Sequence, residues 1–323
     1  MANQDNSNLS VRELETRIDR LDKRIQDIGD PITPADVVQL QQLQRDRDEL
    51  LHLCANPTPV DRVYLARHPG RPGVVDYVAH LFTDFFEQRG DRLYREDPSI
   101  YGGIAMFDNH PVTVIGTRKG KTLQENLACH FGMPCPEGYR KARRLMHQAE
   151  KFKRPIITFV DTAGAYPGKE AEENGQGEAI ARNLAEMSQL RVPIIAVFTG
   201  EGGSGGALAL GVANHLIMLE NAIYSILSPE GFASILWKDP SRSDEACSVM
   251  KLTAQDLYDL KVADEIVKEP LGGAHRDPDA VYHALRGAIR ENLRSLSRLS
   301  GSELVNRRIA KFRAYGIVDT KNS

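Results

Sequence analysis

Hydrophobic residues near the start of the chain recur at alternating intervals of four and three residues. This spacing predicts an amphipathic helix with one apolar stripe, because charges of both signs stand between the apolar positions. The stripe consists of Leu14, Ile18, Leu21, Ile25 and Ile28. Ser10 and Glu13 come directly before it and are typical of a capping box, which satisfies the unpaired amides of a first helical turn.

This helix is expected to end at residues 29–31 (Gly-Asp-Pro), and a second helix is expected from Thr33-Pro34 to about Cys54. Together they predict a helical hairpin over residues 1–55, with residues 1–9 disordered and residues 56–59 as a linker. The stripe is short for a coiled coil, so we expect the hairpin to pack against the main domain or against a partner.

From residue 60 onward, short unbroken apolar runs alternate with segments of helical spacing. Strands are predicted at 102–107, 111–116, 155–160, 193–198, 215–219 and 223–227, and a turn at Asp108-Asn109 joins the first two. Helices are predicted at 76–88, 137–152, 171–190, near Ala207 and over 278–311. Strands that are apolar throughout indicate a sheet covered on both faces. We therefore expect an α/β domain over residues 60–323 that ends in C-terminal helices.

Two predicted strand-to-helix junctions are rich in glycine. Residues 161–168 (DTAGAYPG) follow one strand, residues 200–207 (GEGGSGGA) follow the next, and six glycines fall within residues 200–211. Glycine allows positive φ and lets backbone amides approach a ligand. Amides at the start of a helix also favour a negatively charged oxygen. The two junctions therefore predict an anion-binding or oxyanion-binding site, and tight turns between packed elements are the simpler alternative.

Three familiar motifs fit these segments poorly. Residues 116–122 resemble a phosphate loop but have three residues between the glycines where the motif needs four. Residues 164–169 fail because Glu170 stands where the motif has Ser or Thr. Residues 202–206 satisfy the G-x-S-x-G pattern of a serine hydrolase, and Asp264 and His275 follow in the order of a triad. A run this rich in glycine matches the G-x-S-x-G pattern easily, but a serine hydrolase that uses Ser204 stays open as an alternative.

Composition narrows the class of protein. The 323 residues carry 41 Lys and Arg against 44 Asp and Glu, a net charge of −3 that argues against a dedicated nucleic-acid binder. The four cysteines are too few and too scattered for a disulfide scaffold or a zinc site, so we expect no metal in this chain. The chain shows no signal-peptide pattern and no apolar run long enough to cross a membrane. These features predict a cytoplasmic protein.

Ionisable residues offer little recognisable catalytic machinery. Glu172 and Glu173 are neighbours on a predicted helix and point in different directions, and the nine histidines show no partnered arrangement. Residues 116–154 hold ten basic and three acidic residues, a local charge of +7. This stretch could attract the phosphates of coenzyme A or an acidic carrier domain, or it could be a solvated helix face.

A string of motifs closely resembles the α subunits of bacterial acetyl-CoA carboxylase carboxyltransferase. The resemblance covers residues 65–316, and the N-terminal hairpin also suits this family. Ala163 departs from it, because the family usually has proline there. The matching segments are 131–134 (FGMP), 137–142 (EGYRKA), 155–168, 175–184, 200–207, 228–231 (SPEG), 235–238 (ILWK) and 269–275 (EPLGGAH).

The resemblance implies a crotonase-like fold, the ClpP/crotonase spiral of ββα units, and a half-reaction of fatty-acid biosynthesis. Carboxybiotin on a separate biotin carboxyl carrier protein, charged by biotin carboxylase, would give its carboxyl group to acetyl-CoA to form malonyl-CoA. A β subunit would supply a zinc ribbon and most acetyl-CoA contacts in an α2β2 assembly. We therefore expect this chain to be inactive alone.

The resemblance also suggests roles for the glycine junctions. The amides of Gly205, Gly206 and Ala207 would bind the biotin oxygen, and Gly164 and Ala165 would form a second oxyanion site or a wall. The remaining substrate-binding candidates are Gly202, Gly203, Ser204 and Tyr166. Besides the serine hydrolase, two alternatives stay open: a stand-alone crotonase-family acyl-CoA hydratase or isomerase, for which no catalytic glutamate pair is visible, and a non-catalytic scaffold.

Overall fold

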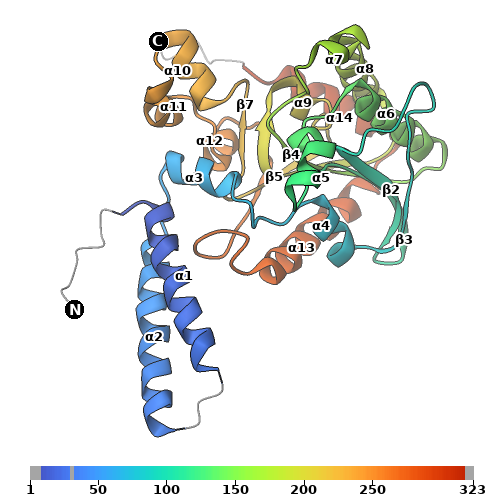
Figure 1. The fold of residues 1–323 in the computed structure, drawn as a ribbon. Helices are drawn as coiled ribbons and strands as arrows, with labels where there is room; N and C mark the ends of the chain where they lie inside the picture. The colour runs from blue at the N-terminus through green and yellow to red at the C-terminus, as the bar shows by residue number, and fades with distance from the viewer. Residues whose placement is uncertain (1–8, 30–32, 317–323) are drawn as a thin grey trace, which may run out of the picture.

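The computed structural model describes residues 9–29 and 33–316, which form a helical hairpin attached to an α/β domain (Figure 1). In these residues the helices are α1 (Val11–Ile28), α2 (Pro34–Leu53), α3 (Pro59–Ala66), α4 (Val74–Leu81), α5 (Leu123–Ala128), α6 (Pro136–Lys151), α7 (Lys169–Glu173), α8 (Gln176–Gln189), α9 (Ser204–Leu208), α10 (Pro229–Trp237), α11 (Ser243–Val249), α12 (Ala254–Asp259), α13 (Pro278–Leu296) and α14 (Gly301–Arg313). Short 3₁₀ turns lie at His130–Gly132 and Pro240–Arg242.

One mixed sheet forms the centre of the α/β domain. Its strands are β1 (Thr83–Glu87), β2 (Ile100–Phe107), β3 (His110–Thr117), β4 (Ile156–Thr162), β5 (Ile194–Gly203), β6 (His215–Leu219), β7 (Ile223–Ser225) and β8 (Glu265–Val267). The strand order is β1-β2-β3-β4-β5-β6-β8, with β7 paired to the end of β5. The first three strands are antiparallel and the others parallel. The carboxyl ends of β4 and β5 therefore lie side by side.

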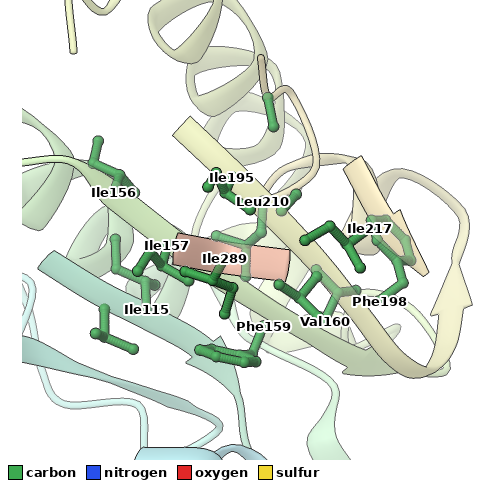
Figure 2. Close-up of a cluster of buried hydrophobic side chains, with 14 of the residues drawn as sticks. Ile115, Ile156, Ile157, Phe159, Val160, Ile195, Phe198, Leu210, Ile217 and Ile289 are labelled. Carbon is green, nitrogen blue, oxygen red and sulfur yellow. The ribbon is translucent and has the colours of Figure 1, made fainter. Parts of the chain in front are cut away.

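Helices cover both faces of the sheet, as its apolar strands predict. A Cβ on Gly102 would meet Leu145 of α6, whereas a Cβ on Gly116 in the paired strand would meet Val74 of α4. Figure 2 shows part of this core, in which labelled side chains of β3, β4, β5 and β6 belong to one buried cluster with Ile289 of α13. The predicted α/β class is confirmed.

The N-terminal hairpin has the predicted helices and caps. Ser10 and Glu13 make the capping box of α1, and Thr33 with Asp36 makes that of α2. The hairpin docks through a small apolar cluster in which Leu14 and Ile18 contact Leu65 of the segment that follows. The predicted linker is shorter than expected, because Thr58 already caps α3. Disorder was expected for residues 1–9; residues 1–8 lie outside the described residues, whereas Leu9 is partly buried and packs against the apolar cluster of the hairpin. The division into two domains stays a prediction.

The helix predicted over residues 76–88 is wrong in its second half. Helix α4 ends at Leu81, and residues 83–87 form β1, which pairs antiparallel with β2. The apolar spacing of these residues fits either structure over so short a run. Asp84 takes a positive φ of 52°, which bends β1 at an irregularity in its register and so lets it follow the edge of the sheet.

Four other predicted boundaries need correction. The helix expected over 171–190 is two helices, because Gly175 adopts a left-handed conformation with φ of 84° between α7 and α8. The C-terminal helix over 278–311 is also two, and Ser300 caps the second. Strand β5 continues to Gly203 rather than ending near Thr199, because its last residues pair with β7. Strand β7 ends at Ser225, short of the predicted 227.

No helix of the described part is long and apolar enough to cross a membrane.

Candidate functional site

The two glycine junctions meet at the carboxyl ends of β4 and β5 and form one surface. A Cβ on Gly203 would lie 2.0 Å from the carbonyl oxygen of Ala163, and one on Gly206 would lie 2.4 Å from the amide nitrogen of Ala165. Real Cβ atoms are not found this close to other atoms, so the two backbones can touch only because both positions are glycine. The sequence predicts each junction separately, and the parallel pairing of β4 and β5 brings them together.

Close packing explains most glycines of the second junction. A Cβ on Gly200 would meet Asp161, one on Gly202 would meet the ring of Phe198, and Gly206 also lies against the hydroxyl of Tyr139. Gly205 differs, because the nearest atom to its Cβ position is a methyl group of Ile180 at an ordinary 3.7 Å. The simpler reading of tight turns therefore accounts for these neighbours but not for Gly205.

The first turn of α9 presents backbone amides at the surface of this junction. A helix leaves its first amides without partners inside the helix, here those of residues 203–206. Ser204 is exposed and Gly205 is partly exposed, whereas Gly206 and Ala207 are buried. Ser204 has a positive φ of 52°, an uncommon conformation for a residue with a side chain. The most accessible donors are therefore the amides around Ser204 and Gly205.

The first junction is held by its own hydrogen bonds. The Thr162 hydroxyl accepts a bond from the amide of Gly164 at 3.1 Å and donates one to its carbonyl at 2.8 Å. Gly164 has a φ of 146°, which L side chains rarely adopt. The amide of Tyr166 donates to the carbonyl of Pro134 at 3.0 Å, and the Tyr166 ring lies 4.3 Å from that of His130. The loop is thus fixed next to the 130–134 segment.

A charged network lies beneath the junctions and was not predicted from the sequence. Asp161 Oδ1 accepts hydrogen bonds from the amide of Glu201 at 2.9 Å and from Lys119 Nζ at 2.7 Å. Burial alone would lower the pKa of Lys119, but the carboxylates of Asp161 and Glu201 outweigh it and raise that pKa. Glu201 also pairs with Arg67, which reaches Glu230. The network ties the ends of β3, β4 and β5 together where the glycine loops begin.

Half of the ten basic residues over 116–154 pair with acidic residues from elsewhere in the chain; these are Lys119, Lys121, Arg140, Lys141 and Arg143. Lys121 pairs with Asp76, and Arg140 pairs with Asp91 at 2.9 Å. Lys141 is buried and contacts Glu96. These pairs lower the net charge of the region below the local +7 of the sequence, which weakens the interpretation that it attracts phosphates.

The serine hydrolase triad is not assembled. The Asp264 carboxylate accepts from the amide of Leu216 at 2.6 Å and binds Lys311, and the His275 ring contacts Glu15 of the hairpin at 2.6 Å. No hydrogen bond of the Ser204 hydroxyl is found among the described residues. The order of Ser204, Asp264 and His275 along the chain therefore does not correspond to a site.

The sequence suggested no partnered arrangement of histidines, but the structure pairs His68 and His275 with Glu15. Nε2 of both His68 and His275 lies near Glu15 Oε1, at 3.3 and 2.6 Å, and the two rings stack with centroids 3.8 Å apart at an angle of 20°. Glu15 also accepts from Tyr64 and Arg276. Glu15, His68 and His275 offer ligand atoms within 4.8 Å of one another, a spacing that could also hold a metal ion. Their hydrogen bonds tie the hairpin to the α/β domain.

All four cysteines are buried and free. Cys135 Sγ lies 3.6 Å from His130 Nδ1, and burial raises the pKa of Cys135 to about 12. A neutral, buried thiol is a poor metal ligand and a poor nucleophile.

Solved structures with the same fold are carboxyl-transferring or decarboxylating enzymes. Transcarboxylase 12S matches with a TM-score of 0.57 and 18% identity over 71% of this chain and 42% of its own. A Pseudomonas malonate decarboxylase hetero-tetramer matches with a TM-score of 0.55 and 18% identity over 65% of this chain and 84% of its own. The expected crotonase-type fold is confirmed.

Sequence comparison narrows the class to one family. The family described as acetyl co-enzyme A carboxylase carboxyltransferase-like matches residues 6–316. The acetyl-coenzyme A carboxylase carboxyl transferase subunit alpha of Geobacillus kaustophilus is 53% identical over 310 residues, 95% of each chain. That of Bacillus subtilis is 52% identical over 313 residues, 97% of this chain and 95% of the relative. The chain belongs to the family of acetyl-CoA carboxylase carboxyltransferase α subunits, as the sequence motifs indicated.

Proposed function

We propose that this chain, together with a β subunit, transfers the carboxyl group of carboxybiotin to acetyl-CoA and so produces malonyl-CoA for fatty-acid biosynthesis. The observation that carries the proposal is the family match over residues 6–316, which spans both glycine loops. The contact between those loops supports the proposal, because it brings backbone amide donors of both loops to one place. The reaction would take place in the cytoplasm.

The glycine loops fit the chemistry that carboxybiotin supplies, which is an activated carboxyl group whose release leaves negative charge on the ureido oxygen. Gly205 is partly exposed and its Cβ position makes only an ordinary contact with Ile180, so a ligand can approach the first-turn amides of α9 there. Amides fixed before the reaction stabilise such an oxygen by about 3–4 kcal/mol per donor. The chain therefore needs no acidic or basic side chain at this position, which agrees with the scarcity of ionisable residues on the loops.

We assign the amides of Gly205 and Gly206 to the ureido oxygen. The amide of Ala207, the third candidate, lies beyond the four first-turn amides of residues 203–206, so we assign Ala207 to holding the turn. Gly164 and Ala165 provide the second set of amides, for an enolate oxygen or as a wall. Gly202, Gly203, Ser204 and Tyr166 surround the approach and exclude water.

The site of this chain is one half of the proposed active site. A β subunit would supply the acetyl-CoA contacts and the zinc ribbon, in an α2β2 complex with the biotin carboxyl carrier protein and biotin carboxylase. Exposed apolar side chains on and beside α10 support such a partner, because patches of this kind mark interfaces. They are Ile226, Ile235, Leu236 and Val249, on the segment joined to β5 through β7.

The proposal is tested by measuring carboxyl exchange between malonyl-CoA and free biotin with the chain alone and with its co-purified partner. Activity on an enoyl-CoA by the chain alone would instead support the hydratase or isomerase alternative. Ester hydrolysis that depends on Ser204 would support the hydrolase.

A further inference from the structure

A cleft of about 1220 Å³ opens at the amino ends of β3, β4 and β5, the opposite edge of the sheet from the glycine loops. Prolines stand side by side along its floor, because the amide of Thr113 bonds to the carbonyl of Pro155 and the amide of Ile156 bonds to that of Pro193. Proline has no amide hydrogen to donate. The floor of the cleft is therefore apolar.

Helices α13 and α14 and the segment between them form the other wall. Leu293, Leu299 and Leu304 line the cleft together with Val192. Arg294, in the last turn of α13, and Arg298, in the turn that follows this helix, line it as well.

The rim of the cleft carries unpaired positive charge. Lys153 and Arg191 also line the cleft, and all four cations are exposed. None of the four forms an ion pair with a described residue. Two acidic residues line the same cleft: Asp108 pairs with Arg290, and Glu150 accepts a hydrogen bond from the amide of Arg191 at 2.7 Å. In contrast to the four rim cations, Arg140 and Lys141 of α6 pair with acids from elsewhere in the chain. Cations therefore outnumber acids around the apolar surface of this cleft.

We propose that this cleft binds an amphipathic anion, an apolar chain or ring that ends in a phosphate or carboxylate. The apolar part lies along the proline floor and the leucine wall. Arg294 and Arg298 bind the anionic group, since guanidinium groups form paired hydrogen bonds with such oxygens. The ten residues of β5 separate this cleft from the glycine loops by about 30 Å, so the ligand binds a site distinct from that of carboxyl transfer.

Calorimetric titration with decyl phosphate, below its micelle concentration, tests the proposal on the full chain alone and in complex with its carboxyltransferase partner. We expect saturable binding at one site per chain in both. The double variant Arg294→Gln/Arg298→Gln should bind at least tenfold more weakly, with Arg307→Gln on the exposed side of α14 as the charge control. Ser297→Trp should block the cleft without changing its charge, and Ser295→Trp, exposed on α13 outside the cleft, is its control.

The comparison of probes separates the parts of the proposal. Inorganic phosphate and decyltrimethylammonium should each bind far more weakly than decyl phosphate. Equal binding of inorganic phosphate would show a mere anion site, and equal binding of the cationic probe would show a mere apolar surface. Either of these two results would overturn the proposal. It would also be overturned by the absence of saturable binding to the wild type, by loss of binding in the complex, or by undiminished binding in a folded Ser297→Trp variant.

Discussion

Gly206 and Ala165 lie in direct backbone contact, so that a Cβ on Gly206 would stand 2.4 Å from the amide nitrogen of Ala165. The two residues belong to loops that follow neighbouring parallel strands. Their contact makes the two loops one rigid surface, in which the amides of each loop have a fixed position relative to those of the other. Electrostatic stabilisation of a developing oxyanion depends on such fixed donors.

We expect Gly206→Ala to lower carboxyl transfer by at least 100-fold, because the added methyl group must push the 164–165 backbone out of position. The effect should appear in kcat, and the melting temperature should also fall. Steady-state kinetics of the complex and a thermal melt measure both. Wild-type turnover in this variant would show that the loop contact is not needed for catalysis.

Gly205→Val tests the accessible amides of the loop without disturbing the close backbone contact at Gly206. The Cβ position of Gly205 has ordinary space, so the variant should fold and assemble with its partner. Its side chain should nevertheless occupy the approach to the first-turn amides and lower transfer by roughly 100- to 1000-fold, the effect of losing one oxyanion donor. The melting temperature and co-purification confirm folding, and normal activity in the folded variant would contradict the amide assignment.

Ser204→Ala tests the hydroxyl at the same turn. The proposed chemistry uses backbone amides, so transfer should stay within about threefold of the wild type, and wild-type protein should show no esterase activity. Alanine keeps the Cβ atom that Ser204 already carries at its positive φ, so the substitution removes the hydroxyl without adding a new group to the backbone. A completely inactive Ser204→Ala variant together with esterase activity in the wild type would favour the hydrolase.

Asp161 is expected to position the second loop through the amide of Glu201. Asp161→Ala removes that acceptor and the partner of Lys119, and a hydrogen bond to a charged group contributes about 1.5–3 kcal/mol. Transfer should therefore fall by roughly 10- to 100-fold. Asp161→Asn keeps an acceptor for the Glu201 amide and should recover part of kcat. Equal kcat in the two variants would show that the hydrogen bond to Glu201 does not position the loop.

The buried pair of Arg71 and Glu269 gives a dependence of stability on pH. Burial alone would raise the pKa of Glu269, but Arg71 and the amide of Asn221 outweigh it and hold that pKa below its ordinary value. The stabilisation is therefore present above the ordinary pKa of 4.5 and is lost as the pH falls through the lowered value. We expect Glu269→Gln to lower the free energy of unfolding at pH 7 by about 3–5 kcal/mol.

Urea unfolding between pH 7 and pH 3 measures this effect. The difference between wild type and Glu269→Gln should narrow as the solution becomes more acidic. Glu291→Gln, on the exposed face of α13, is the matched control and should change little. A constant difference across the range would mean that the charge of Glu269 is not the source of the stabilisation.

Local patterns predicted much of the fold because they act over a few residues. The stripe from Leu14 to Ile28, the caps of the hairpin and the turn at Asp108-Asn109 depend on neighbours in sequence, and the structure has all of them. The boundary errors arise where tertiary pairing decides, as for β1, which becomes a strand because β2 lies beside it. Gly175 is a signal that could have divided the helix over 171–190.

The candidate site was located by sequence but not assembled by it. The glycine clusters indicated two loops, and their contact follows only from the parallel pairing of β4 and β5. The tie among Glu15, His68 and His275 joins residues far apart in the chain and has no spacing that could reveal it. Asp161 carried a weak signal, as an acidic residue placed directly after a buried strand.

Carboxyl exchange between malonyl-CoA and biotin, measured with the purified chain, with its β partner and with the co-purified complex, tests the central claim most directly. The claim is that this chain supplies one half of a carboxyltransferase site. We expect exchange by the complex alone, and its loss in the complex that carries Gly205→Val. Exchange by the isolated chain, or full exchange by the Gly205→Val complex, would contradict the account.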